Sequence, residues 1–203
     1  MRFFVLVLLA LGIAAGAAPA QDGSNAPRLA RATFAGGCFW CMEEAFEPID
    51  GVVSVVSGYI GGRTPRPTYE QVSAGGTGYA EAVEIRYDPS KVSYDRLLQH
   101  FWRNIDPLAV DRQFCDGGNQ YRSAIFYHDA EQRRAAEASK AALERSGQLK
   151  GTIATQIGEA GPFYAAEEYH QDYYRKNPQR YKFYKWSCGR AQRLAQLWGG
   201  EKE

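Results

Sequence analysis

The chain has 203 residues, with 24 Lys or Arg against 23 Asp or Glu, which gives a formal net charge of +1. This balance provides no electrostatic reason to expect nucleic acid or an anionic membrane surface as a partner. The length suits one domain with its own hydrophobic core, to which the aromatic residues, 13% of the chain, can contribute.

The first twenty residues have the pattern of a secretory signal peptide. Arg2 gives a positive start, residues 3–15 are almost unbroken apolar, and the letters APA at 18–20 fit a small-x-small cleavage site. The apolar run is too short to span a bilayer. We therefore expect residues 1–20 to be removed on export, to the periplasm or otherwise by secretion, and residues 21–30 to form a flexible linker. No membrane association is expected after the signal is removed.

Strands and short helices alternate in the first half of the mature chain. Residues 52–60 are rich in β-branched side chains, which is typical of a strand, and Pro48 ends the helical spacing that begins at Cys38. The loop at 61–78 is long for a compact domain, which is typical of a functional or disordered loop. The predicted elements in this half are a strand at 31–35, a helix at 38–48, a strand at 52–60, a short helical turn at 69–72 within the loop, and a strand at 80–87.

The second half contains clear helix boundaries. Ser93 and Asp129 are each placed to cap a following helix, at 94–104 and from 130 onward, and Gly147 ends the second one. Residues 105–120 are predicted to be irregular. The remaining predicted elements are a strand at 121–128, a strand at 152–157, a polar Tyr-rich helix at 167–176 and a final helix that ends at Trp198.

This order of elements predicts an α+β fold. Two strand-helix-strand units separated by a long loop match the ferredoxin-like split βαβ sandwich, in which helices pack on a mostly antiparallel mixed sheet. We expect a single catalytic domain over residues 31–203. Within it, residues 185–203 are expected to form a long irregular tail that carries Cys188.

The residues GGCFWC at 36–41 hold a candidate reactive thiol. Cys38 follows a strand and two glycines and falls in the first turn of a helix, where free backbone N–H groups and the helix dipole stabilise a thiolate. Such positions lower a cysteine pKa from about 8.5 to between about 3.5 and 7.5, so we expect Cys38 to be an ionised nucleophile. Phe39 and Trp40 cannot both enter one core face. Either one packs in the core and the other under the loop, or the two form an apolar pocket wall that accepts a methyl or thioether group.

Four cysteines remain in the mature chain: Cys38, Cys41, Cys115 and Cys188. An even number in an exported chain is compatible with structural disulfides, and an exported binding module in which all four are paired is one alternative. A thioredoxin-type thiol–disulfide oxidoreductase is another, since a Cys-x-x-Cys motif at a helix start is typical of that class. A metal site is not expected, because zinc sites with paired cysteines need a second Cys-x-x-Cys pair.

The stretch GGCFWCMEEAFEPIDGVVSVVSGYIGG resembles the opening of peptide methionine sulfoxide reductase A, and the resemblance covers about residues 32–198. Further blocks that carry it are PTYEQV, GYAEAVEIRYDP, FWRNIDP, DGGNQYRSAIF and FYAAEEYHQDYYRKNP. The resemblance implies reduction of the S epimer of methionine sulfoxide, free or in oxidised proteins, back to methionine. It also implies no bound cofactor and an external thioredoxin-like dithiol as the reductant, and we expect a monomer.

The same resemblance assigns roles to individual residues. Cys38 is implied to be the nucleophile that attacks the sulfoxide sulfur, and Glu81 the general acid that protonates its oxygen. By position alone, at the start of a strand, Glu81 would be a solvated charge at the sheet edge. The residues implied to bind the substrate are Phe39 and Trp40 against the methyl group and Tyr69, Asp116 and Tyr121 around the oxygen.

The thiol that resolves the oxidised Cys38 is a choice among the other cysteines. Cys188 is the first choice, because a Ser-Cys-Gly stretch in a late irregular segment can swing toward the site. Cys41 is the second, since it lies three residues along the same helix, and Cys115 is expected to be a packed thiol. His170, among Tyr and Glu on a polar helix, is expected to have a surface or packing role.

Overall fold

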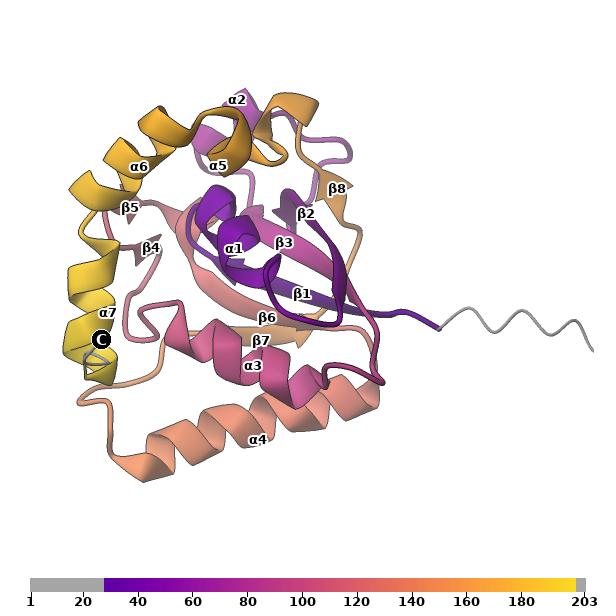
Figure 1. Cartoon of the computed structure of the whole chain (residues 1–203), viewed down its shortest axis with the longest axis vertical. Helices are drawn as coiled ribbons and strands as arrows, with labels where there is room; N and C mark the ends of the chain where they lie inside the picture. Colours follow the sequence, from indigo (N-terminus) through magenta and orange to yellow (C-terminus); the bar gives the residue numbers. More distant parts are fainter. Residues whose placement is uncertain (1–27, 200–203) are drawn as a thin grey trace, which may run out of the picture.

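The computed structural model describes residues 28–199, and within it a six-stranded sheet has the order β7-β6-β1-β3-β2-β8 (Figure 1). The predicted signal peptide and most of the predicted linker lie outside the described residues. The strands of this sheet are β1 (Ala30–Gly36), β2 (Val52–Ile60), β3 (Ala80–Tyr87), β6 (Ser123–Tyr127), β7 (Gln156–Glu159) and β8 (Tyr164–Ala165). Two further strands, β4 (Arg112–Gln113) and β5 (Asp116–Gly117), form a separate small hairpin.

The helices follow the predicted alternation with the strands. They are α1 (Phe39–Phe46), α2 (Tyr69–Ser73), α3 (Tyr94–Arg103), α4 (Ala130–Ser146), α5 (Tyr173–Lys176), α6 (Pro178–Ser187) and α7 (Arg190–Trp198), with 3-10 turns η1 (Asn119–Tyr121) and η2 (Glu168–His170). Among the helices in residues 28–199, none has the length and apolar character needed to cross a bilayer.

The strand pairing confirms the split βαβ arrangement. β1 pairs antiparallel with β3 and with β6, and β2 pairs antiparallel with β3 and with β8. Since β1 and β2 both oppose β3, they run in the same direction with β3 inserted between them, and α1 makes the crossover. β6 and β7 form a parallel pair at one edge. The predicted α+β class with a mostly antiparallel sheet is therefore confirmed.

The two sides of β1 explain why the helices pack where they do. Phe34 points to the helix side, where its ring stacks on Phe46 of α1 at 5.4 Å and on Phe101 of α3 at 4.9 Å. The next residue, Ala35, faces the other way, into a small cluster of mainly alanines and Phe126. Large rings on one side and alanines on the other place the deep core between the sheet and α1, α3 and α4.

Local capping fixes the helix boundaries as predicted. The Ser93 hydroxyl accepts a hydrogen bond from the Arg96 amide at the start of α3, and the Asp129 carboxylate accepts one from the Gln132 amide at the start of α4. Gly147 ends α4 in the left-handed conformation, with φ 65°.

The region after His170 differs most from the prediction. The predicted helix at 167–176 is divided into η2 and α5, because Asp172 takes a left-handed conformation, with φ 53°. Residues 178–187, for which no helix was predicted, form α6, which begins at Pro178 in the first turn. The predicted final helix that ends at Trp198 is confirmed as α7, and α6 and α7 follow one another along one side of the molecule (Figure 1). Within the predicted tail at 185–203, the described residues are therefore mostly helical as far as Trp198.

The other differences are smaller. Residues 105–120, predicted to be irregular, contain the β4–β5 hairpin and the start of η1, and the strand predicted at 152–157 begins only at Gln156. Both hairpin strands are two residues long. Such short strands leave no periodic pattern in a sequence.

Candidate active site

The turn between β1 and α1 places Cys38 directly before the first helical residue, Phe39. Gly37 has φ 86°, a left-handed conformation that favours glycine, and a Cβ there would lie 2.5 Å from Cβ of Gln113. Cys38 then forms the N-terminal cap of α1. Its side chain is 6% exposed, so the thiol lies beneath the surface and is reached only through a cavity.

Glu81 meets the start of α1 from the neighbouring strand. The Phe39 amide donates a hydrogen bond of 3.1 Å to Oε2 of Glu81, whose residue is 2% exposed in the middle of the sheet. The alternative in which Glu81 is a solvated charge at the sheet edge is therefore excluded. Burial raises the pKa of Glu81 from 4.5 to about 8, against the lowering effect of the Phe39 amide. At neutral pH this carboxyl is mostly protonated and can give up a proton.

A small cavity brings the predicted site residues together. Its volume is about 90 Å³, equal to about three water molecules at roughly 30 Å³ each, so it admits the end of a side chain. The lining residues are Cys38, Phe39, Trp40, Tyr69, Glu81, Asp116, Tyr121 and Tyr184. Seven of these eight were singled out from the sequence, and Tyr184 was missed because no helix was predicted at 178–187.

One wall of the cavity is an aromatic cluster built around Trp40. The indole stacks on Tyr173 with ring centroids 3.7 Å apart, and its Nε1 donates a hydrogen bond of 3.1 Å to Nδ1 of His170. The His170 ring also lies 5.0 Å from the Phe39 ring. His170 is only 2% exposed, so the surface alternative is wrong and its packing role is confirmed. It fixes the indole of Trp40 so that the wall keeps its shape.

Two phenols and a carboxyl that line the cavity have raised pKa values. Burial raises the pKa of Tyr69 to about 12, and it also raises the pKa of Tyr121 and of Asp116. The hydroxyl of Tyr184 donates a hydrogen bond of 2.5 Å to Oδ2 of Asp116. Glu167 accepts a hydrogen bond of 2.8 Å from the Tyr69 amide and thereby holds the start of α2 against the site. Protonated phenols therefore line the same cavity as the carboxyl of Glu81.

The charge state of the two buried thiols differs from the prediction. Cys38 and Cys41 are both free and buried. Burial raises the pKa of Cys38, and the neighbouring Cys41 and Glu81 raise it further. The hydrogen bond from Cys38, helped by the charges of Arg190 and Lys185, lowers the pKa of Cys41 to about 6. These shifts oppose the expected ionisation of Cys38 in the free protein and favour a thiolate on Cys41.

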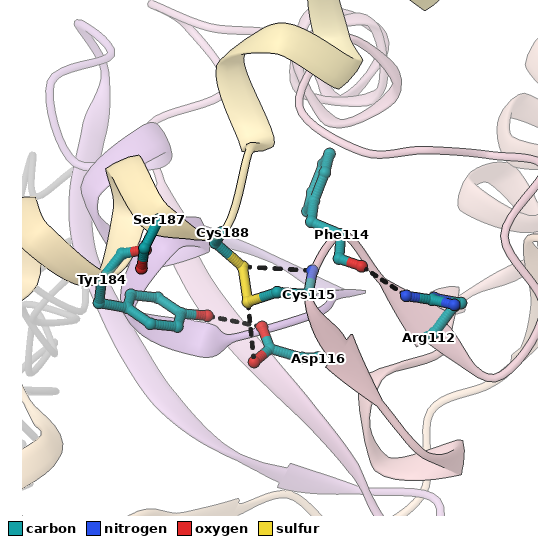
Figure 2. The surroundings of a disulfide bond; sticks show 7 residues. All are labelled: Arg112, Phe114, Cys115, Asp116, Tyr184, Ser187 and Cys188. Atoms are coloured by element: carbon teal, nitrogen blue, oxygen red, sulfur yellow. Dashed lines mark hydrogen bonds between the residues drawn. A yellow bond between two sulfur atoms is a disulfide. The ribbon is translucent and has the colours of Figure 1, made fainter.

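The other two cysteines form a disulfide (Figure 2). Cys115 lies in the turn between β4 and β5, and Cys188 ends α6. The Cys115 residue is exposed, so the prediction of a packed thiol is wrong, and Cys188 is not a free thiol in this state. Asp116 could join these sulfurs around a metal ion only after the disulfide was reduced. Because Cys38 and Cys41 are unpaired, the alternative in which all four cysteines are structural is also wrong.

The chain is similar to proteins of one family over nearly its whole described length. The family model of peptide methionine sulfoxide reductase matches residues 30–202, which include every residue that lines the cavity. Peptide methionine sulfoxide reductase MsrA of Bacillus licheniformis is 54% identical over 168 residues, which are 83% of this chain and 93% of that protein.

Two solved structures extend this similarity to the fold. Methionine sulfoxide reductase A of Corynebacterium diphtheriae is 36% identical, with a TM-score of 0.67, over 76% of this chain and 77% of that one. Mxr1 of Saccharomyces cerevisiae in complex with Trx2 is 26% identical, with a TM-score of 0.50, over 71% of this chain and 84% of that one. None of these similarities favours the thioredoxin-type alternative.

Proposed function

The chain belongs to the peptide methionine sulfoxide reductase A family and is a peptide-methionine (S)-S-oxide reductase, and from that premise we propose how its own residues perform the reaction. The observation that carries the proposal is the pairing of a reactive sulfur and a neutral acid. Cys38 and Glu81 line one cavity, and the amide of the residue after Cys38 is hydrogen-bonded to the Glu81 carboxyl. A sulfoxide oxygen is a poor leaving group until it is protonated, so the attack needs this acid.

Substrate selection follows from the two walls of the cavity. The methyl and methylene groups of methionine sulfoxide pack on Phe39 and Trp40, which offer apolar surface. The oxygen points to Glu81 and to the phenols of Tyr69 and Tyr121, which stay protonated at neutral pH. A sulfoxide sulfur is a stereocentre, so fixing its methyl group, its oxygen and the side from which Cys38 attacks selects one epimer, the S form.

Proton movement accompanies the attack. Cys38 passes its thiol proton to the Cys41 thiolate as its sulfur bonds to the sulfoxide sulfur, and Glu81 gives a proton to the oxygen. The sulfur–oxygen bond of the substrate then breaks, and the released hydroxide adds to the Cys38 sulfur as the sulfur–sulfur bond breaks, so methionine leaves and Cys38 becomes a sulfenic acid. The products are methionine, Cys38 sulfenic acid, a neutral Cys41 thiol and an ionised Glu81, so atoms and charge balance.

Regeneration uses a second thiol of the same chain. This thiol condenses with the Cys38 sulfenic acid, which forms a disulfide and releases water, and a thioredoxin-like protein then reduces that disulfide. Mxr1, a structural relative, has been solved in complex with Trx2, which supports this class of partner. Cys41 is the free thiol beside Cys38, whereas Cys188 is bonded to Cys115 and would first have to be released. No bound cofactor is needed, because the electrons come from thiols.

We also propose that the enzyme acts outside the cytoplasm, in the periplasm or after secretion. The support is the apolar leader at residues 1–20 with its APA end. Fractionation of cells that express the full chain tests this: a mature form without the leader is expected outside the cytoplasm, and an uncleaved form inside would contradict export.

The activity itself is tested with racemic methionine sulfoxide and a small dithiol. We expect chiral analysis to show loss of the S epimer and survival of the R epimer. Consumption of both epimers at equal rates would contradict the two-wall selection, and consumption of neither would contradict the proposed chemistry.

A further inference from the structure

We propose that reduction of the Cys115–Cys188 disulfide creates a zinc site, in which the two thiolates and the carboxylate of Asp116 bind the ion and water fills the fourth position. The ligand atoms of these three residues lie within 4.8 Å of one another. No Cys-x-x-Cys motif is involved, so the spacing of the cysteines along the chain does not indicate this site. Zinc and the disulfide exclude each other, because both use the same two sulfurs.

The distances around Cys115 fit a zinc ion. Oδ1 of Asp116 lies 3.6 Å from the Cys115 sulfur (Figure 2). Zinc bonds of about 2.3 Å to sulfur and about 2.0 Å to a carboxylate oxygen place these two atoms about 3.5 Å apart at a tetrahedral angle. Two sulfur ligands at that angle lie about 3.8 Å apart, a separation that the two cysteines can reach once their bond is reduced. Side-chain rotation alone can therefore bring the three donors onto one ion.

Two of the three donors already have the outer hydrogen-bond partners that are typical of metal ligands. The Cys115 amide donates a hydrogen bond of 3.2 Å to the Cys188 sulfur, and the Tyr184 hydroxyl donates one of 2.5 Å to Oδ2 of Asp116. Such bonds orient a ligand and stabilise its anionic form. They leave Oδ1 of Asp116, the oxygen next to the Cys115 sulfur, available to the ion.

The buried guanidinium of Arg190 balances the charge of this centre. Two thiolates and one carboxylate around a divalent ion leave one negative charge in excess. Arg190 is 4% exposed, lies over the ring of Phe114 in the hairpin, and donates to the Asn104 carbonyl and the Met42 sulfur rather than to a carboxylate. Burial raises the pKa of Asp116, and the charge of Arg190 opposes this shift. Arg190 therefore favours an anionic group at this position.

The site is open to an ion, whereas the other two thiols are not. Cys115 is exposed in the hairpin turn, and Cys188 lines a groove of about 400 Å³ from which water can complete the coordination. Cys38 and Cys41 are at most 6% exposed, and tyrosines of α5 and α6 pack over them. A thiophilic ion therefore meets the pair at the hairpin and the end of α6 first.

The site forms in two balanced steps. The external dithiol gives two electrons and two protons to the Cys115–Cys188 disulfide and is itself oxidised to a disulfide. Zn²⁺ then displaces the two thiol protons as it binds both sulfurs. A consequence that rests on the proposed function follows from the second step. Bound zinc withdraws both thiols from disulfide exchange and stops turnover with a protein dithiol, whereas Cys38 can still reduce one sulfoxide.

Zinc binding by the reduced and the oxidised protein is the direct test. The protein is reduced with a phosphine, freed of it in the absence of air, and titrated with Zn²⁺ against a chromophoric chelator, with Co²⁺ as a spectroscopic probe of the ligands. We expect about one zinc ion per reduced chain, thiolate-to-cobalt charge-transfer absorption, and binding neither by the oxidised protein nor of Mg²⁺. Equal zinc binding in both redox states, or a cobalt spectrum without thiolate character, would overturn the site.

Substitutions separate this site from other zinc ligands. Cys188→Ser should weaken zinc binding at least about 100-fold, and Tyr184→Phe, which removes a hydrogen bond to Asp116 but no ligand, by about 10- to 100-fold. Cys41→Ser should bind zinc as the wild type does, and so should Ser187→Ala, the matched control next to Cys188. Loss of binding in Cys41→Ser, or wild-type affinity in Cys188→Ser, would overturn the proposal.

Turnover with thioredoxin as the reductant tests the consequence for catalysis. Reduced protein loaded with one equivalent of zinc should lose this turnover and regain it when a chelator removes the ion. Equal turnover with and without zinc would overturn the inhibition. Failure of the zinc-free protein to form methionine would instead count against the proposed function, and the zinc titration, which involves no sulfoxide, would still decide the site.

Discussion

Replacement of Glu81 by Gln tests the acid that the site depends on. The Gln side chain has nearly the same shape, and its oxygen can still accept the hydrogen bond that Phe39 gives to Oε2. It cannot release a proton. With a pKa of about 8, Glu81 is about 90% protonated at pH 7, whereas at its ordinary value of 4.5 only about 0.3% would be. Burial therefore supplies about 300 times more of the acidic form.

The expected loss follows from the usual contribution of general acid catalysis. We predict a fall of about 10² to 10⁴ in kcat for Glu81→Gln, equivalent to about 3–5 kcal/mol in the barrier. KM should change little, because the aromatic wall is unaltered. The assay is methionine formation with a small dithiol from pH 6 to 9.5. The wild-type rate should fall above pH 8 as Glu81 ionises, and the variant should lack that dependence.

The same substitution has an opposite effect on stability. The folded-state pKa of Glu81 is raised, so the native protein holds a proton that the unfolded chain loses above pH 4.5, and stability falls as the pH rises from about 4.5 to about 8. A rise of the pKa from 4.5 to about 8 corresponds to at most about 5 kcal/mol. We predict that Glu81→Gln is more stable than the wild type at pH 9 by urea unfolding. A wild-type rate for the variant, or equal stability at pH 9, would refute this role for Glu81.

Three further substitutions probe the rest of the site. Cys38→Ser should abolish sulfoxide reduction in the dithiol assay, and any residual turnover would remove Cys38 from the mechanism. Trp40→Ala should raise KM at least about tenfold, since the indole is a large part of the apolar wall. Val53→Ala, at an exposed position on β2, is the control. An equal effect of both substitutions on KM would contradict the role of Trp40 in substrate binding. Cys188→Ser should allow one turnover but block multiple turnover with thioredoxin, as measured by NADPH consumption in a coupled assay. Unchanged steady-state turnover would show that another thiol regenerates Cys38.

The sheet was predictable because its strands carry strong local signals. Val52–Ile60 and Ala80–Tyr87 have the predicted ends, since β-branched runs bounded by glycine or by Asp88-Pro89 leave little choice of boundary. Ser93 and Asp129 were equally clear as helix caps. The edge strands were harder, because β7 and β8 are short and obtain their pairing from β6 and β2 rather than from their own pattern.

The α6 helix was not predicted because its outer face is apolar. Phe183 and Trp186 are 68% and 69% exposed, while the buried side carries Tyr181. Apolar residues on both sides of a helix remove the periodic pattern on which sequence-based prediction depends. Tyr184 could not be placed in the cavity without that helix, and neither could the covering of Cys38 and Cys41.

The charge state of Cys38 was not predictable from the sequence, for a related reason. A helix start is visible in the sequence and lowers a cysteine pKa, but burial and the approach of Glu81 are tertiary effects that raise it. The pairing of Cys115 with Cys188, 73 residues apart, is likewise set by the fold. The residues of the site were thus largely predictable, and their protonation and bonding were not.

The most direct measurement uses Cys41→Ser with the Cys115–Cys188 disulfide intact, so that Cys38 is the one free thiol among the three remaining cysteines. The protein is mixed with one equivalent of the S epimer of methionine sulfoxide and then with a reagent that labels sulfenic acids. We predict one methionine per chain and a label on Cys38. Methionine formed with Cys38 unoxidised, or oxidation of Cys38 without methionine, would contradict attack by Cys38 on the sulfoxide.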